Sequence, residues 1–197
     1  MSHHIYHTEA FILGSHMQGE ANKYIKLFTK ELGFITASAQ GIRHAKSKLR
    51  YSLQDYSLST VALVRGKEIW RLTNALRIAN VKSDFQKQKE LFLVFARIFA
   101  LLERLLGGEE RHEKLFMLVH DAFMFLRQES LSDDLVRNAE YLIVLRLLHE
   151  LGYVGDVPAC RTFLATHEWN IEVITQVGAV EKQLLLAIND SIRESQL

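Results

Sequence analysis

QGIRHAKSKL, residues 40–49, separates two groups of short β-type segments. Gly41 predicts a turn directly after the candidate strand that precedes it. This turn opens a short span that is rich in cations, namely Arg43, Lys46, Lys48 and Arg50. If residues 43–50 are helical, Arg43, Lys46, Ser47 and Arg50 share one face, and if they are extended, Lys46, Lys48 and Arg50 share one face. Both alternatives predict a row of positive charge beside the strands.

Segments rich in β-branched and aromatic residues lie on both sides of this row, and glycines separate them. The pattern predicts five strands, over residues 8–13, 23–29, 34–40, 56–65 and 68–76. Gly66 and Lys67 fall between the last two and predict a hairpin turn. Five short strands over about 70 residues favour a closed or nearly closed barrel, because closure removes the exposed edges of an open sheet. An SH3-like barrel satisfies the same strand count.

Apolar residues recur at helical spacing in the second half of the chain. A first helix carries a stripe from Leu91 to Leu105 and ends at Gly107. Ser132 is a candidate cap for a later helix, and residues 163–175 fit either a strand or a helix. Three further helices are predicted, over residues 115–126, 135–151 and 180–192.

The change of pattern near residue 80 predicts an α+β chain, with a five-stranded barrel domain over residues 1–80 and an all-α domain over residues 81–197. The formal net charge of +1 is divided unevenly between these two parts. The first holds 11 Lys and Arg against 5 Asp and Glu, and the second holds 13 against 18. This asymmetry predicts a basic module that meets a polyanion, joined to a part with a different role.

A basic row beside a barrel can follow a phosphate backbone without selecting a base sequence, although a lone basic cluster is more often a solvated loop. Six rings are available for stacking on bases, namely Tyr24, Phe28, Phe34, Tyr51, Tyr56 and Trp70. We expect most of them to fill the barrel core, and Trp70 is the ring to test first. The predicted DNA-binding residues are Arg43, Lys46, Lys48, Arg50, Lys23, Lys26, Lys30, Arg65, Lys67, Arg71 and Trp70.

Catalytic and metal motifs are incomplete in this sequence, so we expect no enzyme, no cofactor and no metal site. His112, His149 and His167 each precede a glutamate, but none is followed four residues later by a second histidine, as a zinc-protease helix requires. Gly66-Lys67 lacks the earlier glycine of a phosphate-binding loop. Cys160, the only cysteine, cannot form an intrachain disulfide. The most apolar stretch, residues 91–106, contains charged residues, so we expect a cytoplasmic protein without a membrane span.

Several motifs resemble the bacterial RecO family of recombination mediators. Residues 40–49 and the following Leu53-Gln54-Asp55-Tyr56 are similar to the family's Lys-Gly-x-Arg-x-x-Lys-Ser-x-Leu followed by Leu-Gln-Pro-Phe. Gly19-Glu20, followed by Leu27-Phe28-Thr29, is similar to the family's opening strands. A second match lies in the helical half, where Arg146 to Tyr153 resembles the family's last long helix. Cys160 stands alone where many members bind zinc through four cysteines, so zinc is not expected here.

The resemblance implies an oligonucleotide-binding (OB) fold, single-stranded DNA as ligand, and annealing of complementary strands in recombinational repair on the nucleoid. It implies RecR and the single-stranded-DNA-binding protein as partners, with the recombinase as an indirect one. The helical domain then receives the acidic tail of the single-stranded-DNA-binding protein, through a basic pocket that uses Arg97, Arg104, Arg127 or Arg146. An adaptor whose barrel binds protein and an RNA-binding barrel protein remain the alternatives.

Overall fold

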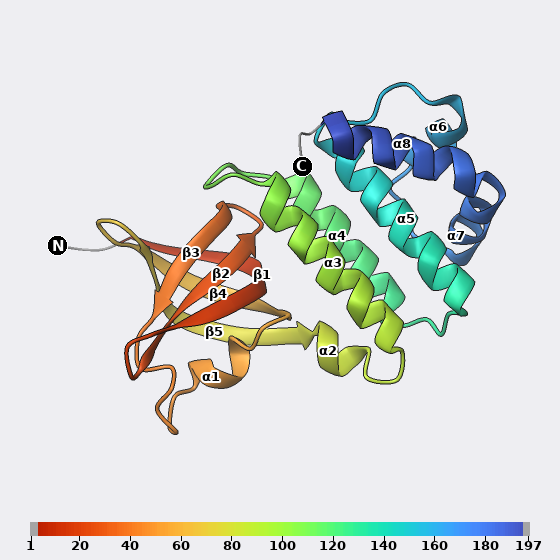
Figure 1. Ribbon diagram of the computed structural model, residues 1–197. Coiled ribbons are helices and arrows are strands. Elements are labelled where there is room, and N and C mark those ends of the chain that lie inside the picture. The colour runs from red at the N-terminus through yellow and green to blue at the C-terminus, as the bar shows by residue number, and fades with distance from the viewer. Residues whose placement is uncertain (1–3, 195–197) are drawn as a thin grey trace. The chain divides into compact units, whose positions relative to one another are not determined.

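The computed structural model describes residues 4–194 (Figure 1). Five strands form a closed barrel in the order β1-β2-β3-β5-β4, which confirms the predicted five-stranded OB-type barrel. β3 pairs with β5 in parallel, whereas the other four neighbouring pairs are antiparallel. The strands are β1 (Ile5–Gln18), β2 (Asn22–Thr29), β3 (Gly33–Ala39), β4 (Ser57–Arg65) and β5 (Trp70–Asn80).

Alternation along the strands fills the barrel interior. On β2, Ile25 and Leu27 are fully buried in the barrel core, so Tyr24 and Lys26 between and beside them point outward. β1 is longer than its apolar run predicts, because a register shift between Ile12 and Gly14 lets the strand continue along β2 to Gln18. The core also includes residues from β3, β4 and β5, among them Ile35, Ala37, Val61, Leu63, Trp70 and Leu72.

The basic row after β3 has neither of the two predicted conformations. Residues 41–48 form mainly turns and bends, and a helix of one turn, α1 (Leu49–Ser52), follows them. Ile42 and Leu53, on either side of residues 43–52, are buried in the barrel core. These two apolar anchors fix the basic row against one end of the barrel.

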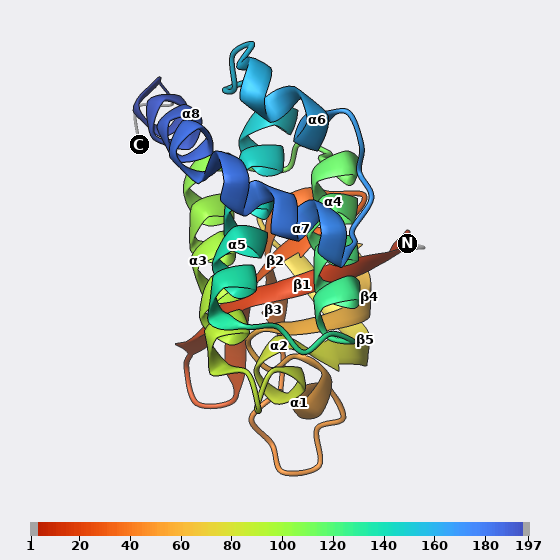
Figure 2. The ribbon, with the colours of Figure 1, turned by 90° about the vertical axis from the view of Figure 1, so that its right-hand side faces the viewer.

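The second half of the chain is helical, as predicted. Figure 1 and Figure 2 both show α3, α4 and α5 running side by side, and the rings of Phe95 on α3 and Phe123 on α4 pack edge to face, 5.5 Å apart. The ambiguous residues 163–175 fall mostly in two helices, α6 and α7. Ser132 is the N-cap residue of α5, as predicted, although its side chain accepts no capping hydrogen bond. The α-helices are α2 (Val81–Asp84), α3 (Lys89–Leu105), α4 (Glu113–Leu126), α5 (Asp133–Glu150), α6 (Arg161–Leu164), α7 (Ile171–Val177) and α8 (Glu181–Glu194), and the 3-10 turns are η1 (Pro158–Cys160) and η2 (Gly178–Val180).

The chain divides into two compact units. The barrel unit continues beyond residue 80 through α2 to Gln86 and also includes Leu106–Glu113, the loop between α3 and α4. The helical unit consists of Lys87–Leu105 and the chain from Lys114 onward. Within the barrel unit, the backbone N–H of Phe34 donates to the carbonyl of Gly108 at 3.1 Å, so the loop is hydrogen-bonded to β3.

Candidate nucleic-acid interface

Three of the predicted cations meet at one end of the barrel, around a pocket of about 400 Å³ that we call the α1 pocket. Lys23 comes from the start of β2, Arg43 from the turn segment and Arg50 from α1. Lys23 and Arg43, 20 positions apart in the chain, are brought together because β2 pairs with β3, with Lys23 opposite Ala39. The pocket is lined by Lys23, Ile42, Arg43, Arg50, Leu53 and Gln54.

The cations of the α1 pocket are held by neutral groups. Lys23 Nζ donates to Ser15 Oγ at 3.1 Å, and one Arg43 Nη donates to the carbonyl of Gly19 at 3.3 Å. None of the three cations forms an ion pair with a carboxylate of residues 4–194. Asp55 is connected to Lys23 only through Ser15, whose Oγ donates a hydrogen bond to Asp55 Oδ1 at 2.8 Å. The positive charge of the pocket is therefore left available for an anion.

An aromatic side chain stands beside the α1 pocket. Tyr51, the residue after Arg50, is 60% exposed. The guanidinium of Arg77 on β5 lies 3.4 Å from the centre of its ring and donates to Gln54 Oε1 at 3.0 Å. Because Gln54 also lines the α1 pocket, the ring and the pocket are neighbours.

Lys46 and Lys48, the other two predicted cations of the turn segment, are exposed and do not line the α1 pocket. Neither forms an ion pair with any residue that the structure describes. They flank the pocket in sequence and add to the positive charge of this end of the barrel.

The outer face of β2, β3 and β5 carries a second group of predicted residues. The register aligns Tyr24 with Ser38 of β3, and Ser38 in turn with Arg71 of β5. On the other side of Tyr24, His16 of β1 lies with its ring 5.2 Å away. Lys26 points outward from the same strand, two residues beyond Tyr24. This face is the one through which OB folds commonly bind oligonucleotides.

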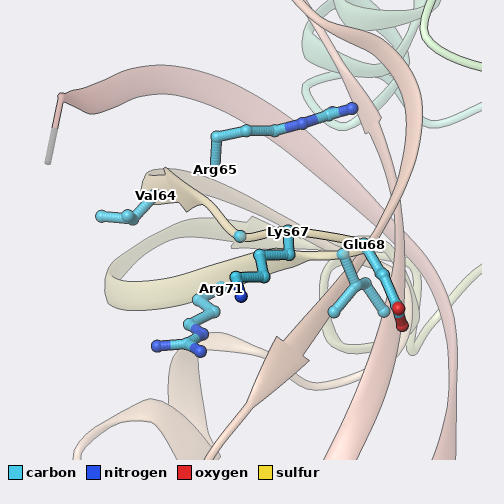
Figure 3. A pocket seen from close by; sticks show the side chains of 7 residues that line it. Val64, Arg65, Lys67, Glu68 and Arg71 are labelled. Carbon is cyan, nitrogen blue, oxygen red and sulfur yellow. The ribbon is translucent and has the colours of Figure 1, made fainter.

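The turn between β4 and β5 lines another pocket, of about 630 Å³. The backbone N–H of Gly66 donates to the carbonyl of Ile69 at 3.1 Å and closes the hairpin turn, as predicted. Figure 3 shows the side chains of Arg65 and Arg71 extending away from each other, so the two cations do not converge on one point. Lys67, at the tip of the turn, is exposed.

The loop Leu106–Glu113 already occupies part of this basic surface. Arg65 forms an ion pair with Glu109, and Lys30 Nζ lies 3.9 Å from Glu113 Oε1. Lys30 follows the last residue of β2, so it lies about 23 Å along the strand from Lys23 and does not join the α1 pocket. We call Lys30, Arg65 and Trp70, together with Glu109 and Glu113, the acidic-loop surface.

Trp70 is not the exposed ring that the sequence predicts. It is 5% exposed and belongs to the barrel core, where its ring packs edge to face against Tyr6 at 5.1 Å. Its Nε1 donates to Glu109 Oε1 at 3.2 Å, and the Arg65 guanidinium lies 4.8 Å from its centre. This burial argues against Trp70 as a ring that stacks on a base, because alternation along β5 turns the indole inward.

Two of the arginines predicted to form the basic pocket, Arg97 and Arg146, bind other groups of the helical unit. Arg97 pairs with Glu140 through two hydrogen bonds of 2.5 and 2.7 Å. Arg146 is 3% exposed, donates to the carbonyls of Phe163 and Glu168, and lies 4.6 Å from the Trp169 ring. Burial lowers the pKa of Arg146 to about 10. Arg146 therefore holds the segment after α5 in place and is not a surface group that meets a partner.

Cys160 is buried, and this burial raises the pKa of its thiol. A raised pKa disfavours the thiolate, which is the reactive form. Among residues 4–194, no group of three or more His, Cys, Asp or Glu side chains is arranged to hold a metal ion. No helix in this range has both the length and the apolar character that crossing a membrane requires.

Comparison with known proteins identifies relatives of both the barrel strands and the helical part of the chain. The family model described as recombination protein O N terminal matches residues 1–80, and a DNA repair protein RecO from Thermoanaerobacter sp. (strain X514) is 25% identical over 158 residues, covering 78% of this chain and 60% of the relative. The chain is similar to RecO proteins over most of its length, and the family model covers its barrel strands. RecO of Heliobacterium modesticaldum is 30% identical over 159 residues, covering 79% of this chain and 55% of the relative. RecO of Dehalococcoides mccartyi is 35% identical over 94 residues, covering 46% of this chain and 37% of the relative. The chain thus spans about 60% of the length of the first RecO relatives that it matches.

Several residues of the interface were absent from the predicted set. Tyr51 was named only as one of six rings, and Arg77, Gln54 and His16 were not singled out. Alternation along β2 could have placed Tyr24 outward from the sequence alone. If Ile25 points into the barrel core, its neighbour Tyr24 must point to the opposite face of the sheet. No simple signal places Arg77 beside Tyr51, because a register shift in the β4–β5 pair interrupts the alternation of β5.

Proposed function

We propose that the barrel unit binds single-stranded DNA without regard to base sequence, and that the chain acts in recombinational DNA repair. The observation that carries this proposal is the α1 pocket, in which Lys23, Arg43 and Arg50 converge without a carboxylate partner among residues 4–194. A bound phosphate backbone neutralises such cations and releases its counterions. The outward residues Tyr24, Lys26 and Arg71 extend the same surface along the face that OB folds use for oligonucleotides.

The proposed role is binding and strand annealing, with no chemical step. Two DNA strands repel each other through their phosphates, and a basic surface that holds one strand lowers this repulsion for the second. The relatives are named DNA repair proteins, in keeping with action on DNA, and the proposed place of this action is the cytoplasm, on the nucleoid. It works there with RecR to load recombinase onto DNA coated by the single-stranded-DNA-binding protein.

The helical unit is proposed to receive the acidic tail of the single-stranded-DNA-binding protein. A groove of about 390 Å³ between α3, α5 and α8 has an apolar lining that includes Leu101, Val144 and Ile188. Arg104 also lines it and forms no ion pair with any residue within 4–194. Apolar side chains of a peptide fit such a lining, and Arg104 attracts its acidic residues.

Titration of a fluorescent acidic peptide with an apolar C-terminus tests this groove. Arg104→Glu is expected to abolish binding, whereas Lys182→Glu, which makes the same charge change at an exposed position on α8 outside the groove, is expected to leave it unchanged. Equal loss in both variants would assign the effect to net charge and remove the groove from the proposal.

Titration of labelled single-stranded DNA at several salt concentrations tests the DNA-binding proposal itself. If about four to six phosphates are neutralised, log affinity falls against log salt with a slope of roughly −3 to −4. Absence of binding at low salt would contradict the proposal. The same titration with RNA of identical sequence separates the RNA-binding alternative, and a mixture of two complementary labelled strands tests annealing.

A further inference from the structure

Tyr51 is the most exposed aromatic residue of the structure. No other Phe, Tyr or Trp side chain between residues 4 and 194 approaches its 60% exposure. A single exposed apolar side chain is common on protein surfaces, so a role for Tyr51 depends on what lies beside the ring. Phe28 and Trp70, two of the other candidate rings, are buried in the barrel unit at 0% and 5% exposure.

One contact to the Tyr51 ring, made by an arginine that is itself hydrogen-bonded, favours one orientation of the ring. Arg77 lies almost directly over the ring, with its guanidinium carbon 3.4 Å from the ring centre. Arg77 is itself fixed by the hydrogen bond to Gln54. The cation lies over one face of the ring, and the residue as a whole remains 60% exposed. The ring is therefore a rigid, preorganised platform, which binds at a lower entropic cost than a freely rotating side chain.

The platform adjoins the site where phosphates are expected. Arg50, which lines the α1 pocket, is the residue before Tyr51, and Gln54 belongs to the pocket and also anchors Arg77. A single strand that places a phosphate against Arg43 and Arg50 therefore brings an adjoining base within reach of the ring. Cations that bind phosphate beside a ring that stacks on a base are the combination that single-strand binding requires.

We propose that Tyr51 stacks on one base of the bound strand and gives the barrel its preference for single strands over duplex. This inference rests on the proposed binding of single-stranded DNA and adds a site for one nucleotide of any base. Every base has a flat face, so the platform selects no sequence. In a duplex both faces of each base are covered by its neighbours, so a duplex gains the phosphate contacts and not the stacking contact.

The test compares Tyr51→Ala with Tyr51→Phe on an oligothymidylate and on a duplex of equal length. Tyr51→Ala is expected to weaken binding of the single strand about 10-fold, within the range of roughly 5- to 150-fold that corresponds to one stacked base. Tyr51→Phe keeps the ring and is expected to bind within about twofold of wild type. Duplex affinity and the salt slope are expected to be unchanged, because no phosphate contact is lost.

Two controls sharpen the result. An oligomer of the same length without bases is expected to bind wild type and Tyr51→Ala equally. Leu76→Ala removes another exposed apolar side chain, 70% exposed on β5, and is expected to leave single-strand affinity unchanged. The melting temperature of each variant establishes that it is folded.

Equal single-strand affinity of wild type and Tyr51→Ala would overturn the inference, and so would an equal loss of affinity in Tyr51→Phe or on the duplex. If wild type itself binds no single strand at low salt, the proposed function fails, and this outcome is distinct from failure of the platform alone.

Discussion

The two basic regions of the barrel unit differ in what their cations already contact. In the α1 pocket, Lys23 and Arg43 are hydrogen-bonded to a hydroxyl and a carbonyl oxygen. On the acidic-loop surface, Arg65 is paired with Glu109, and Lys30 lies beside Glu113. The α1 pocket holds three cations and no carboxylate, whereas the acidic-loop surface holds two cations and two carboxylates. Only the α1 pocket keeps its positive charge available for a phosphate.

This difference shows that the number of cations in a sequence does not give the positive charge that is available to bind a ligand. Carboxylates of the loop mimic phosphate groups, so a nucleic acid must displace Glu109 before it reaches Arg65. The loop is also held by a backbone hydrogen bond to Phe34, which makes displacement more costly than release of a lone side chain. We therefore expect DNA contacts to concentrate at the α1 pocket.

Replacing Lys23, Arg43 and Arg50 together by glutamine is expected to have the largest effect. Loss of three phosphate contacts makes the slope of log affinity against log salt less negative by about 2, and lowers single-strand affinity at low salt on the order of 100-fold. The measurement is titration of a labelled oligothymidylate at several salt concentrations.

A matched variant removes the same charge elsewhere. Lys87, Lys89 and Lys182 of the helical unit are all replaced by glutamine, which changes the net charge equally. We expect less than a threefold effect on affinity. Similar losses in the two triple variants would mean that total charge, rather than the α1 pocket, governs binding.

Gly33→Ala is expected to disrupt the acidic-loop surface. Gly33 has a φ of 70°, and a Cβ there would overlap the carbonyl oxygen of Glu110. We expect the free energy of unfolding to fall by about 2 to 3 kcal/mol, as measured by denaturant unfolding. Gly19→Ala is the control, because Gly19 has a φ of 62° with no atom within 4 Å of a built Cβ, so only backbone strain of about 1 kcal/mol is expected. If Gly33→Ala and Gly19→Ala lower the free energy of unfolding equally, the loop moves away from the added Cβ without a loss of stability.

Glu109→Gln is expected to raise single-strand affinity about threefold, because it frees Arg65 for one further phosphate. Glu110→Gln removes the same charge from a residue whose carboxylate lies 4.0 Å from His112 Nε2, and it is expected to change affinity much less. The gain should vanish when Arg65→Gln is combined with Glu109→Gln. A gain that persists without Arg65 would assign the effect to long-range charge.

Arg65→Gln alone is expected to have the smallest effect, less than twofold on single-strand affinity, because Glu109 already occupies the guanidinium. The same substitution should alter stability by less than about 1 kcal/mol, as is usual for an exposed ion pair. A tenfold loss of affinity in a titration would place Arg65 in the DNA path and remove the contrast between the two regions.

The fold was largely predictable from the sequence because its signals are local. Glycines at turns and alternation in short apolar segments indicated all five strands, and the spacing of leucines and phenylalanines indicated the long helices. The errors arose where local rules are interrupted. The shift between Ile12 and Gly14 extended β1, and the basic row formed turns because Ile42 and Leu53 both enter the core.

The candidate site was less predictable, since it depends on contacts between distant residues. The pairing of Arg65 with Glu109 joins positions 44 apart in the chain. The contact between Arg77 and Tyr51 depends on the register of β5, which shifts beside Arg77, opposite Leu58 and Ser59. Composition indicated how many cations the barrel has. Their partners followed only from the three-dimensional arrangement.

Ultraviolet crosslinking of an oligothymidylate to the wild-type chain, followed by mass spectrometry of its peptides, tests most directly which region binds DNA. We predict crosslinks within residues 41–54, with Tyr51 the most heavily modified side chain. Crosslinks confined to Trp70 and the β4–β5 turn, or to the helical unit, would contradict the assignment of the α1 pocket as the binding surface.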